Sequence, residues 1–451
     1  MHALAASRPS SNSDRSFFAH HGFWAPGIRL FRRLGFALKA SIVSLCFVLP
    51  LAVLAWAWFS QYSEQRDFTA KEIDGVTFTR VVMPLLPAVM QQRQDALKGE
   101  GTAGREAVAE ALKQVDAAQA ASGDAFGTAP ALKLLKERLA GLPAAGAGSE
   151  QLLSGHGAAA QAVIDLVGQA TDGSNLTLDP DIDTYYLMDG ALMRIPQLTE
   201  EVGRLRVLAA TAAGGKADAA LTAQIHRAQA HADLLRSQLA VAVAKVEAVR
   251  PGIAKALRFE EVEQQEERFF KLAGEASDAT GIDAAGTDLA RQLQSQQKVM
   301  LSELDGLLAA RLDRLDTKAT AIASVVALGL VMAGYFFWSF YRVMEGGLRE
   351  TRRHLRAMTD GDLTTHPQPW GRDEAAELMV ALAQMQAALR AIVSEVRGGS
   401  DEILRSSTEI ANGAIDLSSR TEQTAANLEE TAASMEQISG TVANTADHAA
   451  Q

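Results

Sequence analysis

Residues 40–59 read ASIVSLCFVLPLAVLAWAWF and residues 319–341 read ATAIASVVALGLVMAGYFFWSFY, and neither stretch contains a charged residue. A helix rises about 1.5 Å per residue, so each stretch is long enough to cross the roughly 30 Å hydrocarbon core of a bilayer. Aromatic residues of the kind found at membrane interfaces lie near the ends of the two stretches: Trp56, Trp58, Trp338 and Tyr341. We therefore predict two transmembrane helices, at 40–59 and 319–341, in preference to two buried core helices.

The first stretch has an alternative interpretation as a cleaved signal peptide, with AWA at 55–57 as a weak cleavage site. It is long for the apolar region of a signal peptide, and 39 residues precede it. We therefore favour an uncleaved membrane anchor.

Lysine and arginine residues beside the two stretches indicate their orientation, because cytoplasmic flanks are enriched in positive charge. The flanks outside the pair hold nine: Arg29, Arg32, Arg33, Lys39, Arg342, Arg349, Arg352, Arg353 and Arg356. The flanks that face the intervening segment hold six: Arg66, Lys71, Arg80, Arg311, Arg314 and Lys318. We expect a multi-pass protein of the bacterial inner membrane with both termini cytoplasmic, a cytoplasmic segment at 1–39 and residues 60–318 outside the cytoplasm.

The composition excludes several classes of protein. The chain of 451 residues has a net charge of −11, whereas nucleic-acid binders neutralise phosphates with clustered Lys and Arg, so no nucleic-acid partner is expected. The only cysteine, Cys46, excludes a disulfide framework, a thiolate zinc site and an iron–sulfur cluster. Aromatic residues make up only 6% of the chain, which favours helices over strands. We predict an all-α fold.

The segment 60–318 is predicted to be a helical-bundle sensor domain. It has no strand-like alternation, and glycine-rich breaks such as those at 99–104, 142–149 and 280–286 separate its amphipathic stretches. Short breaks of this kind imply antiparallel helices that pack as bundles. The segment is longer than one short four-helix bundle requires, so either its helices are very long or two bundles are stacked.

One motif in this segment is a candidate ligand site, LDPDIDTYYLMD at 178–189. We expect Asp179 to cap a helix whose first residue is Pro180, since these residue types suit those two positions. Capping explains the acidic residues more simply than a cation site or a ligand rim does. An arginine on a mostly apolar helix face can bind a ligand carboxylate bidentately, although it more often snorkels or pairs with an acid of the chain. The side chains that we consider for contact with a small ligand are Arg80, Tyr185, Tyr186 and Arg194.

Motifs of catalysis and metal binding are not found in the sequence. It has no GxSxG, no HExxH, no Walker loop and no GxGxxG after a strand. His226 and His231 are five residues apart, off the i, i+4 spacing that places two ligands on one helix face. We expect no enzyme activity, no metal and no cofactor.

The segment 342–396 combines two helical stretches with a glycine-punctuated connector, TDGDLTTHPQPWGRDE at 359–374. Apolar residues of the second stretch follow alternating steps of four and three, which is an a/d seam: Leu378, Leu382, Met385, Leu389 and Ile392. Two such helices joined by a connector close a parallel four-helix bundle in a dimer.

This segment resembles a HAMP domain, particularly at GDLT (361–364) and GRDE (371–374). The resemblance implies that Gly361 and Leu363 belong to the connector and that Glu374 opens the second helix. The chain departs from that pattern early in the first helix, where the usual proline is missing and two glycines stand nearby at 346–347.

Residues 397–451 continue the seam and contain a repeated frame. Acid or amide pairs recur every seven residues, at Glu422–Gln423, Glu429–Glu430 and Glu436–Gln437, so the pairs share one exposed helix face. Small residues stand three and four positions before each pair. An ordinary charged coiled-coil flank does not explain this frame.

The stretch resembles the first methylation helix of methyl-accepting chemotaxis proteins, which are transmembrane chemoreceptors. The resemblance implies that the second member of each pair is modified, which here means Gln423, Glu430 and Gln437. It also implies that a chemotaxis methylesterase deamidates the glutamines and that a methyltransferase esterifies the glutamates. Receptors of this family are homodimers, and full-length ones form trimers of dimers.

The chain stops at Gln451, before the kinase-contacting tip of that family. We therefore expect a truncated receptor, with adaptor and histidine kinase as partners only if that tip were present. Two alternatives remain: a sensor histidine kinase cut off before its catalytic part, and a structural membrane coiled coil. The kinase is disfavoured because residues 397–451 contain only His448, without a phosphoacceptor frame.

Overall fold

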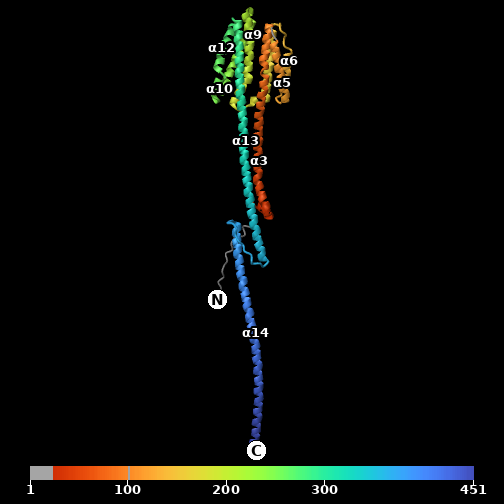
Figure 1. The fold of residues 1–451 in the computed structure, drawn as a ribbon, viewed down its shortest axis with the longest axis vertical. Helices are drawn as coiled ribbons and strands as arrows, with labels where there is room; N and C mark the ends of the chain where they lie inside the picture. The colour runs from red at the N-terminus through yellow and green to blue at the C-terminus, as the bar shows by residue number, and fades with distance from the viewer. Residues whose placement is uncertain (1–23, 100–101, 451) are drawn as a thin grey trace. The chain divides into compact units, whose positions relative to one another are not determined.

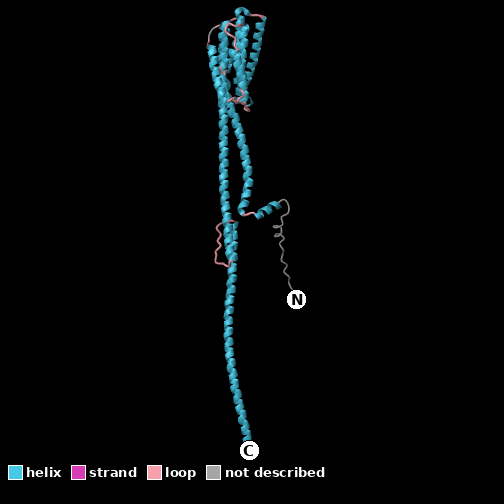
Figure 2. Cartoon of the chain, turned by 90° about the vertical axis from the view of Figure 1, so that its right-hand side faces the viewer, coloured by secondary structure: helices cyan, strands magenta, loops and turns pink. Residues whose placement is uncertain are grey.

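The computed structural model describes residues 24–99 and 102–450, and in this part of the chain the regular elements are all helices, joined by loops, without a strand (Figure 2). The predicted all-α fold class is confirmed. The chain divides into two compact units, one of residues 48–327 and one of residues 1–47 with 328–451, and each is described by itself.

The unit of residues 48–327 contains two sets of helices that lie side by side on one hydrophobic core (Figure 1). Contacts between α7 and α9 join the two sets. The first set consists of α4 (Leu85–Lys98), α5 (Ala103–Ser122), α6 (Ala129–Ala140) and α7 (Ser149–Gly173). The second consists of η1 (Leu176–Leu178), α8 (Ile182–Met188), η2 (Asp189–Arg194), α9 (Ile195–Thr211), η3 (Ala212–Lys216), α10 (Ala219–Val249), α11 (Ile253–Ala256) and α12 (Phe259–Glu275).

Two long helices complete this unit and continue beyond it. They are α3 (Phe36–Val82) and α13 (Ala279–Thr359), and their parts within 48–327 pack on the same core through residues such as Val76 and Leu304. The length of the segment 60–318 left open whether its helices are very long or two bundles are stacked. The structure instead has two helix sets that lie side by side and share one core.

Glycine ends helices at several of the predicted breaks, but the break predicted at 280–286 is wrong, because α13 runs through it. Gly99 and Gly123 are left-handed, with φ of 66° and 57°, at the C-caps of α4 and α5. Glycine adopts this conformation without a steric penalty, so it is the usual residue at this position. Pro84 separates α3 from α4, whereas Pro50 lies inside α3 and does not end it.

The other unit contains α2 (Ala25–Arg33), the start of α3, the end of α13 and α14 (Glu374–Ala449). The last turns of α13 pack against the first turns of α14, which buries Thr351 and His354 on one helix and Met379 and Leu382 on the other. From residue 391 to residue 450 every residue of the chain is exposed.

Three helical stretches in the described residues are long and apolar enough to cross a membrane: Phe36–Lys98, Ala279–Thr359 and Glu374–Ala449. The first two contain the predicted spans, and both are more apolar than the stretch in α14. Two spans and cytoplasmic termini stay predictions.

Candidate functional site

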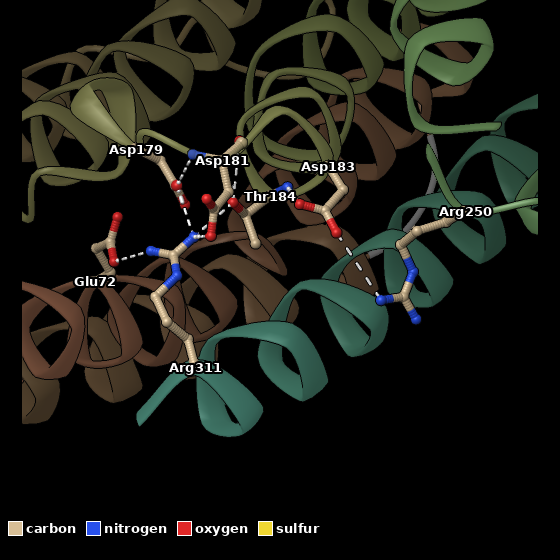
Figure 3. Close-up of polar contacts among 7 residues, drawn as sticks. All are labelled: Glu72, Asp179, Asp181, Asp183, Thr184, Arg250 and Arg311. Carbon is tan, nitrogen blue, oxygen red and sulfur yellow. Dashed lines mark hydrogen bonds and ion pairs between the residues drawn. The ribbon is translucent and has the colours of Figure 1, made fainter. Parts of the chain in front are cut away.

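A buried cluster around Arg311 joins α3, α13 and the segment that leads into α8 (Figure 3). Arg311 donates from Nη1 to Glu72 Oε2 at 3.0 Å and from Nη2 to Asp179 Oδ1 at 2.7 Å. Nη2 also lies 2.8 Å from Asp181 Oδ2 and 2.9 Å from the hydroxyl oxygen of Thr184. The side chains of Glu72 and Asp179 are fully buried, and that of Arg311 is 12% exposed. One guanidinium therefore holds three carboxylates.

The segment before α8 is shaped by its own aspartates. Asp179 Oδ1 accepts a hydrogen bond of 2.9 Å from the N–H of Asp181, and α8 begins at Ile182 with Asp181 as its N-cap residue. The prediction that Asp179 caps a helix beginning at Pro180 is therefore wrong. The carboxylate of Asp179 binds Arg311 instead, a contact between residues 132 positions apart that local capping rules do not include.

The electrostatics of the cluster favour a proton on Glu72. Burial, together with the neighbouring charge of Asp179, raises the pKa of Glu72 to about 8, although Arg311 acts in the opposite direction. Glu72 Oε1 and Asp179 Oδ2 are buried without a hydrogen-bond partner among the described residues. A neutral Glu72 removes one of the three negative charges that face a single arginine.

A second arginine stands beside the cluster. Arg250, which follows α10, has Nη1 3.9 Å from Asp183 Oδ2 and Nη2 3.7 Å from Glu303 Oε2 on α13. Its side chain is 40% exposed, so solvent weakens these pairs. The described ranges contain no group of three His, Cys, Asp or Glu residues arranged to hold a metal ion.

Both arginines that we predicted as ligand contacts are engaged by acids of the chain. Arg194 donates from Nε and Nη2 to the two oxygens of Asp189, at 3.1 and 3.0 Å, and from Nη1 to Gln238 at 2.8 Å. Arg80 pairs with Asp305 of α13. A role for either arginine in ligand binding stays a prediction.

The two predicted tyrosines lie next to the cluster segment on α8. Their rings meet edge to face, with centroids 5.2 Å apart. Tyr185 is 36% exposed, whereas Tyr186 packs against the hydrophobic core. Tyr185 is therefore the more accessible of the two, and ligand contact by either stays a prediction.

A groove of about 600 Å³ lies between α7, α9 and α10, and none of the four predicted ligand residues lines it. Glu200 and Glu201 line the groove, and Arg204 and His231 lie beside them. Beneath it the buried Arg93 donates to Glu200 Oε1 at 2.6 Å, and His231 Nδ1 lies 3.0 Å from Glu201 Oε1. The sequence gives no signal for this groove, because its residues come from three separate helices.

The predicted connector residues lie between α13 and α14. Gly361 ends α13 with φ of 83°, and the N–H of Asp362 reaches the carbonyl of Ala357 at 2.8 Å, which is the Schellman arrangement. The carbonyl of Leu363 accepts hydrogen bonds from Gln386 and Arg390 of α14. The connector is thereby fixed to the second helix.

The start of α14 follows the sequence pattern. Glu374 is its first residue, and Asp373 is its N-cap, with Oδ1 accepting a hydrogen bond of 2.9 Å from the N–H of Ala376. A carboxylate in the first turn also interacts favourably with the helix dipole.

The two glycines that replace the usual proline lie inside α13, which continues through them. A Cβ on Gly346 would lie 2.9 Å from the Trp370 ring, and one on Gly347 would lie 2.7 Å from the Cβ of Ala375. The glycines therefore allow the connector and α14 to approach α13 closely.

The predicted modification residues lie far along α14. Gln423, Glu430 and Gln437 belong to one uninterrupted helix and are all exposed. No other described part of the chain covers this face.

Comparison with known proteins identifies one domain. Residues 346–391 match the HAMP domain family, within the predicted range 342–396. No curated protein matches the chain. Among solved structures, the chain is similar to the NasR transcription antiterminator, with 17% identity and a TM-score of 0.43 over 76% of this chain and 100% of that one. A HAMP domain and candidate membrane spans together indicate a signal-transducing membrane protein.

Proposed function

We propose that the chain is a transmembrane chemoreceptor of the methyl-accepting type. Residues 60–318 sense a small ligand outside the cytoplasm, and the HAMP domain passes the signal to α14. The observation that carries the proposal is the repeated acid or amide pair on the exposed face of α14, in the helix that leaves the HAMP domain. A structural coiled coil requires exposed charge but not this frame.

Methylation of these residues would act through charge. A methyl ester neutralises a glutamate without altering the backbone, and glutamine is a neutral residue of similar shape. Like charges about 4 Å apart in water repel by about 1 kcal/mol. Neutralising several of them across a bundle changes the free-energy difference between its two packing states by a few times this energy. A bundle whose two states are nearly equal in free energy responds strongly to such a change.

A second copy of the chain is the partner that we propose for the apolar seam of α14. Leu428, Met435, Ile438 and Val442 follow heptad spacing, and each is more than half exposed. A matching seam from another α14 would bury them in a homodimer. The chemotaxis methyltransferase and methylesterase would act on the face that remains in solvent.

The Arg311 cluster supports a route from the sensor to the membrane. Arg311 lies on α13 shortly before the stretch 319–341, and Glu72 lies on α3 shortly after the stretch 40–59. A small movement of the segment at Asp179 would bias both helices through one guanidinium.

The proposal is tested by methylation of the purified full chain, alone and with a complete signalling domain fused after Gln451. Each sample is incubated with the chemotaxis methyltransferase and S-adenosylmethionine, then digested for mass spectrometry. We expect a methyl ester at Glu430 directly, and at Gln423 and Gln437 only after treatment with the methylesterase.

Glu409 is the matched control, because it lies on the same exposed helix but outside the repeated frame. It should remain unmodified in every sample. No mass increase at Glu430 in either sample, with a known receptor methylated in parallel, contradicts the proposal.

A further inference from the structure

The short helix α2 has one apolar and one basic face. It carries the sequence APGIRLFRR, and Trp24 precedes it. At about 100° per residue, Leu30, Phe31 and Ile28 follow one another on one arc of the helix, and Arg32, Arg29 and Arg33 follow on the other, with Arg32 next to Ile28 at the boundary. A basic amphipathic helix of this kind is typical of a membrane surface.

The chain turns between α2 and α3. Leu34 is extended, with φ of −98° and ψ of 145°, and α3 begins at Phe36. In Figure 2, α2 lies across the direction of α3 and does not continue it. If α3 crosses a bilayer, α2 therefore runs along the bilayer surface.

Contacts between aromatic rings indicate at which level of the bilayer the turn between α2 and α3 lies. The Phe36 ring stacks on Tyr341 with centroids 5.9 Å apart, and Tyr341 stacks on Trp338 at 6.1 Å. Tyr341 ends the second apolar stretch, where aromatic residues mark a membrane interface. The start of α3, and α2 with it, is therefore at the level of the lipid headgroups.

On the apolar face of α2, Ile28 and Phe31 are half-buried in this chain. Leu30 is 51% exposed, and Arg29 and Arg33 are exposed on the basic side. Lys39 adds a fourth positive charge one turn into α3. Apolar area next to clustered arginines complements a surface of acyl chains and phosphates, because a guanidinium binds phosphate bidentately.

We propose that α2 lies flat in the headgroup region of the leaflet at which α3 begins and binds anionic phospholipids. The side of α2 that carries Ile28 and Phe31 faces the acyl chains, and Arg29, Arg32 and Arg33 bind lipid phosphates.

The test uses the full chain in lipid nanodiscs. Cys46→Ser removes the only native thiol. A fluorophore whose emission reports polarity is then attached to Ile28→Cys in one protein and to Arg33→Cys in another. In discs that contain phosphatidylglycerol, the label at position 28 should emit at shorter wavelength and be quenched by nitroxides on the acyl chains. The label at position 33 should emit as in water.

Lipid charge is varied next. Replacing phosphatidylglycerol with phosphatidylcholine should move the emission of the label at position 28 toward its value in water. Substituting Arg29, Arg32 and Arg33 together by Gln should abolish this dependence on lipid. Substituting Arg349, Arg352 and Arg353, after the second apolar stretch, by Gln is the matched control. In this variant the emission of the label at position 28 should still depend on phosphatidylglycerol.

Three results would overturn the proposal. Equal emission from positions 28 and 33 would show that α2 does not lie on the surface. A shielded label at position 28 that acyl-chain nitroxides do not quench would show that protein covers this face. A dependence on phosphatidylglycerol that survives loss of Arg29, Arg32 and Arg33 would show that these arginines do not bind the lipid.

Discussion

Arg311 is the residue on which three carboxylates of the segment 60–318 converge. Its guanidinium is the partner of the fully buried Glu72 and Asp179 carboxylates. We expect Arg311→Ala to lower the free energy of unfolding by about 3–5 kcal/mol, because it leaves the buried carboxylate of Asp179 without a cation. Thermal unfolding of the full chain in detergent, followed by circular dichroism, measures the change.

Arg314 provides the control for this substitution, since it is an exposed arginine on the same helix. Arg314→Ala should change stability by less than about 0.5 kcal/mol. Equal losses from the two substitutions would show that the cluster does not hold the helices.

Glu72 should make the stability of the sensor depend on pH. Its pKa in the folded chain is about 8 against an ordinary value of 4.5, so between these pH values the folded chain binds one more proton than the unfolded chain. Stability contributed by Glu72 is therefore present below pH 4.5 and lost as pH rises through 8. Even half of this difference in pKa corresponds to about 2 kcal/mol in the free energy of unfolding.

Unfolding measured from pH 5 to pH 9 tests this dependence. Glu72→Gln should flatten the profile and make the variant more stable than the native chain at the alkaline end. Glu64→Gln, at an exposed position on the same helix, should leave the profile unchanged. A profile that falls equally in the native chain and in Glu72→Gln would exclude Glu72 as the titrating group.

At the scale of elements, two of the glycines of α7 have different surroundings. A Cβ on Gly173 would lie 2.1 Å from the carbonyl oxygen of Phe126, whereas a Cβ on Gly168 would meet nothing within 4 Å. We expect Gly173→Ala to destabilise the sensor by about 1–3 kcal/mol, because backbone must move. Gly168→Ala should stabilise it by up to about 1 kcal/mol, through helix propensity. Denaturant unfolding of both variants gives the comparison, and a stabilising Gly173→Ala would contradict the close approach.

The element η2 explains why Arg194 is not free. Asp189 and Arg194 are five residues apart, which in an α-helix separates their directions by about 140°. In the wider π-helical turn at 189–194 the hydrogen bonds run from i to i+5, so the two side chains meet. Sequence spacing alone places them on different faces.

At the scale of the whole molecule, the orientation in the membrane remains a prediction. The excess of Lys and Arg on the outer flanks predicts cytoplasmic termini. A reporter that is active only outside the cytoplasm should be active when inserted after residue 200 and silent when fused at Gln451. The reverse pattern, or a mature chain that begins near Ser60, would contradict this topology.

The sequence by itself determined those features that depend on neighbours along the chain. Helical class, the apolar stretches at 40–59 and 319–341 and the seam of α14 follow from composition, length and heptad spacing, which are local properties. The HAMP domain and the start of α14 at Glu374 were predicted through resemblance to that family at GDLT (361–364) and GRDE (371–374), and both are confirmed.

The tertiary structure alone decided which polar side chains meet. Arg311 counted in the sequence only as a flanking charge, yet it binds Glu72, 239 positions away, and Asp179, 132 positions away. Asp179 was expected to cap a helix because capping is a local rule, but a buried guanidinium competes for the same carboxylate. Such contacts depend on how two helix sets share one core, and no spacing along a single helix encodes that arrangement.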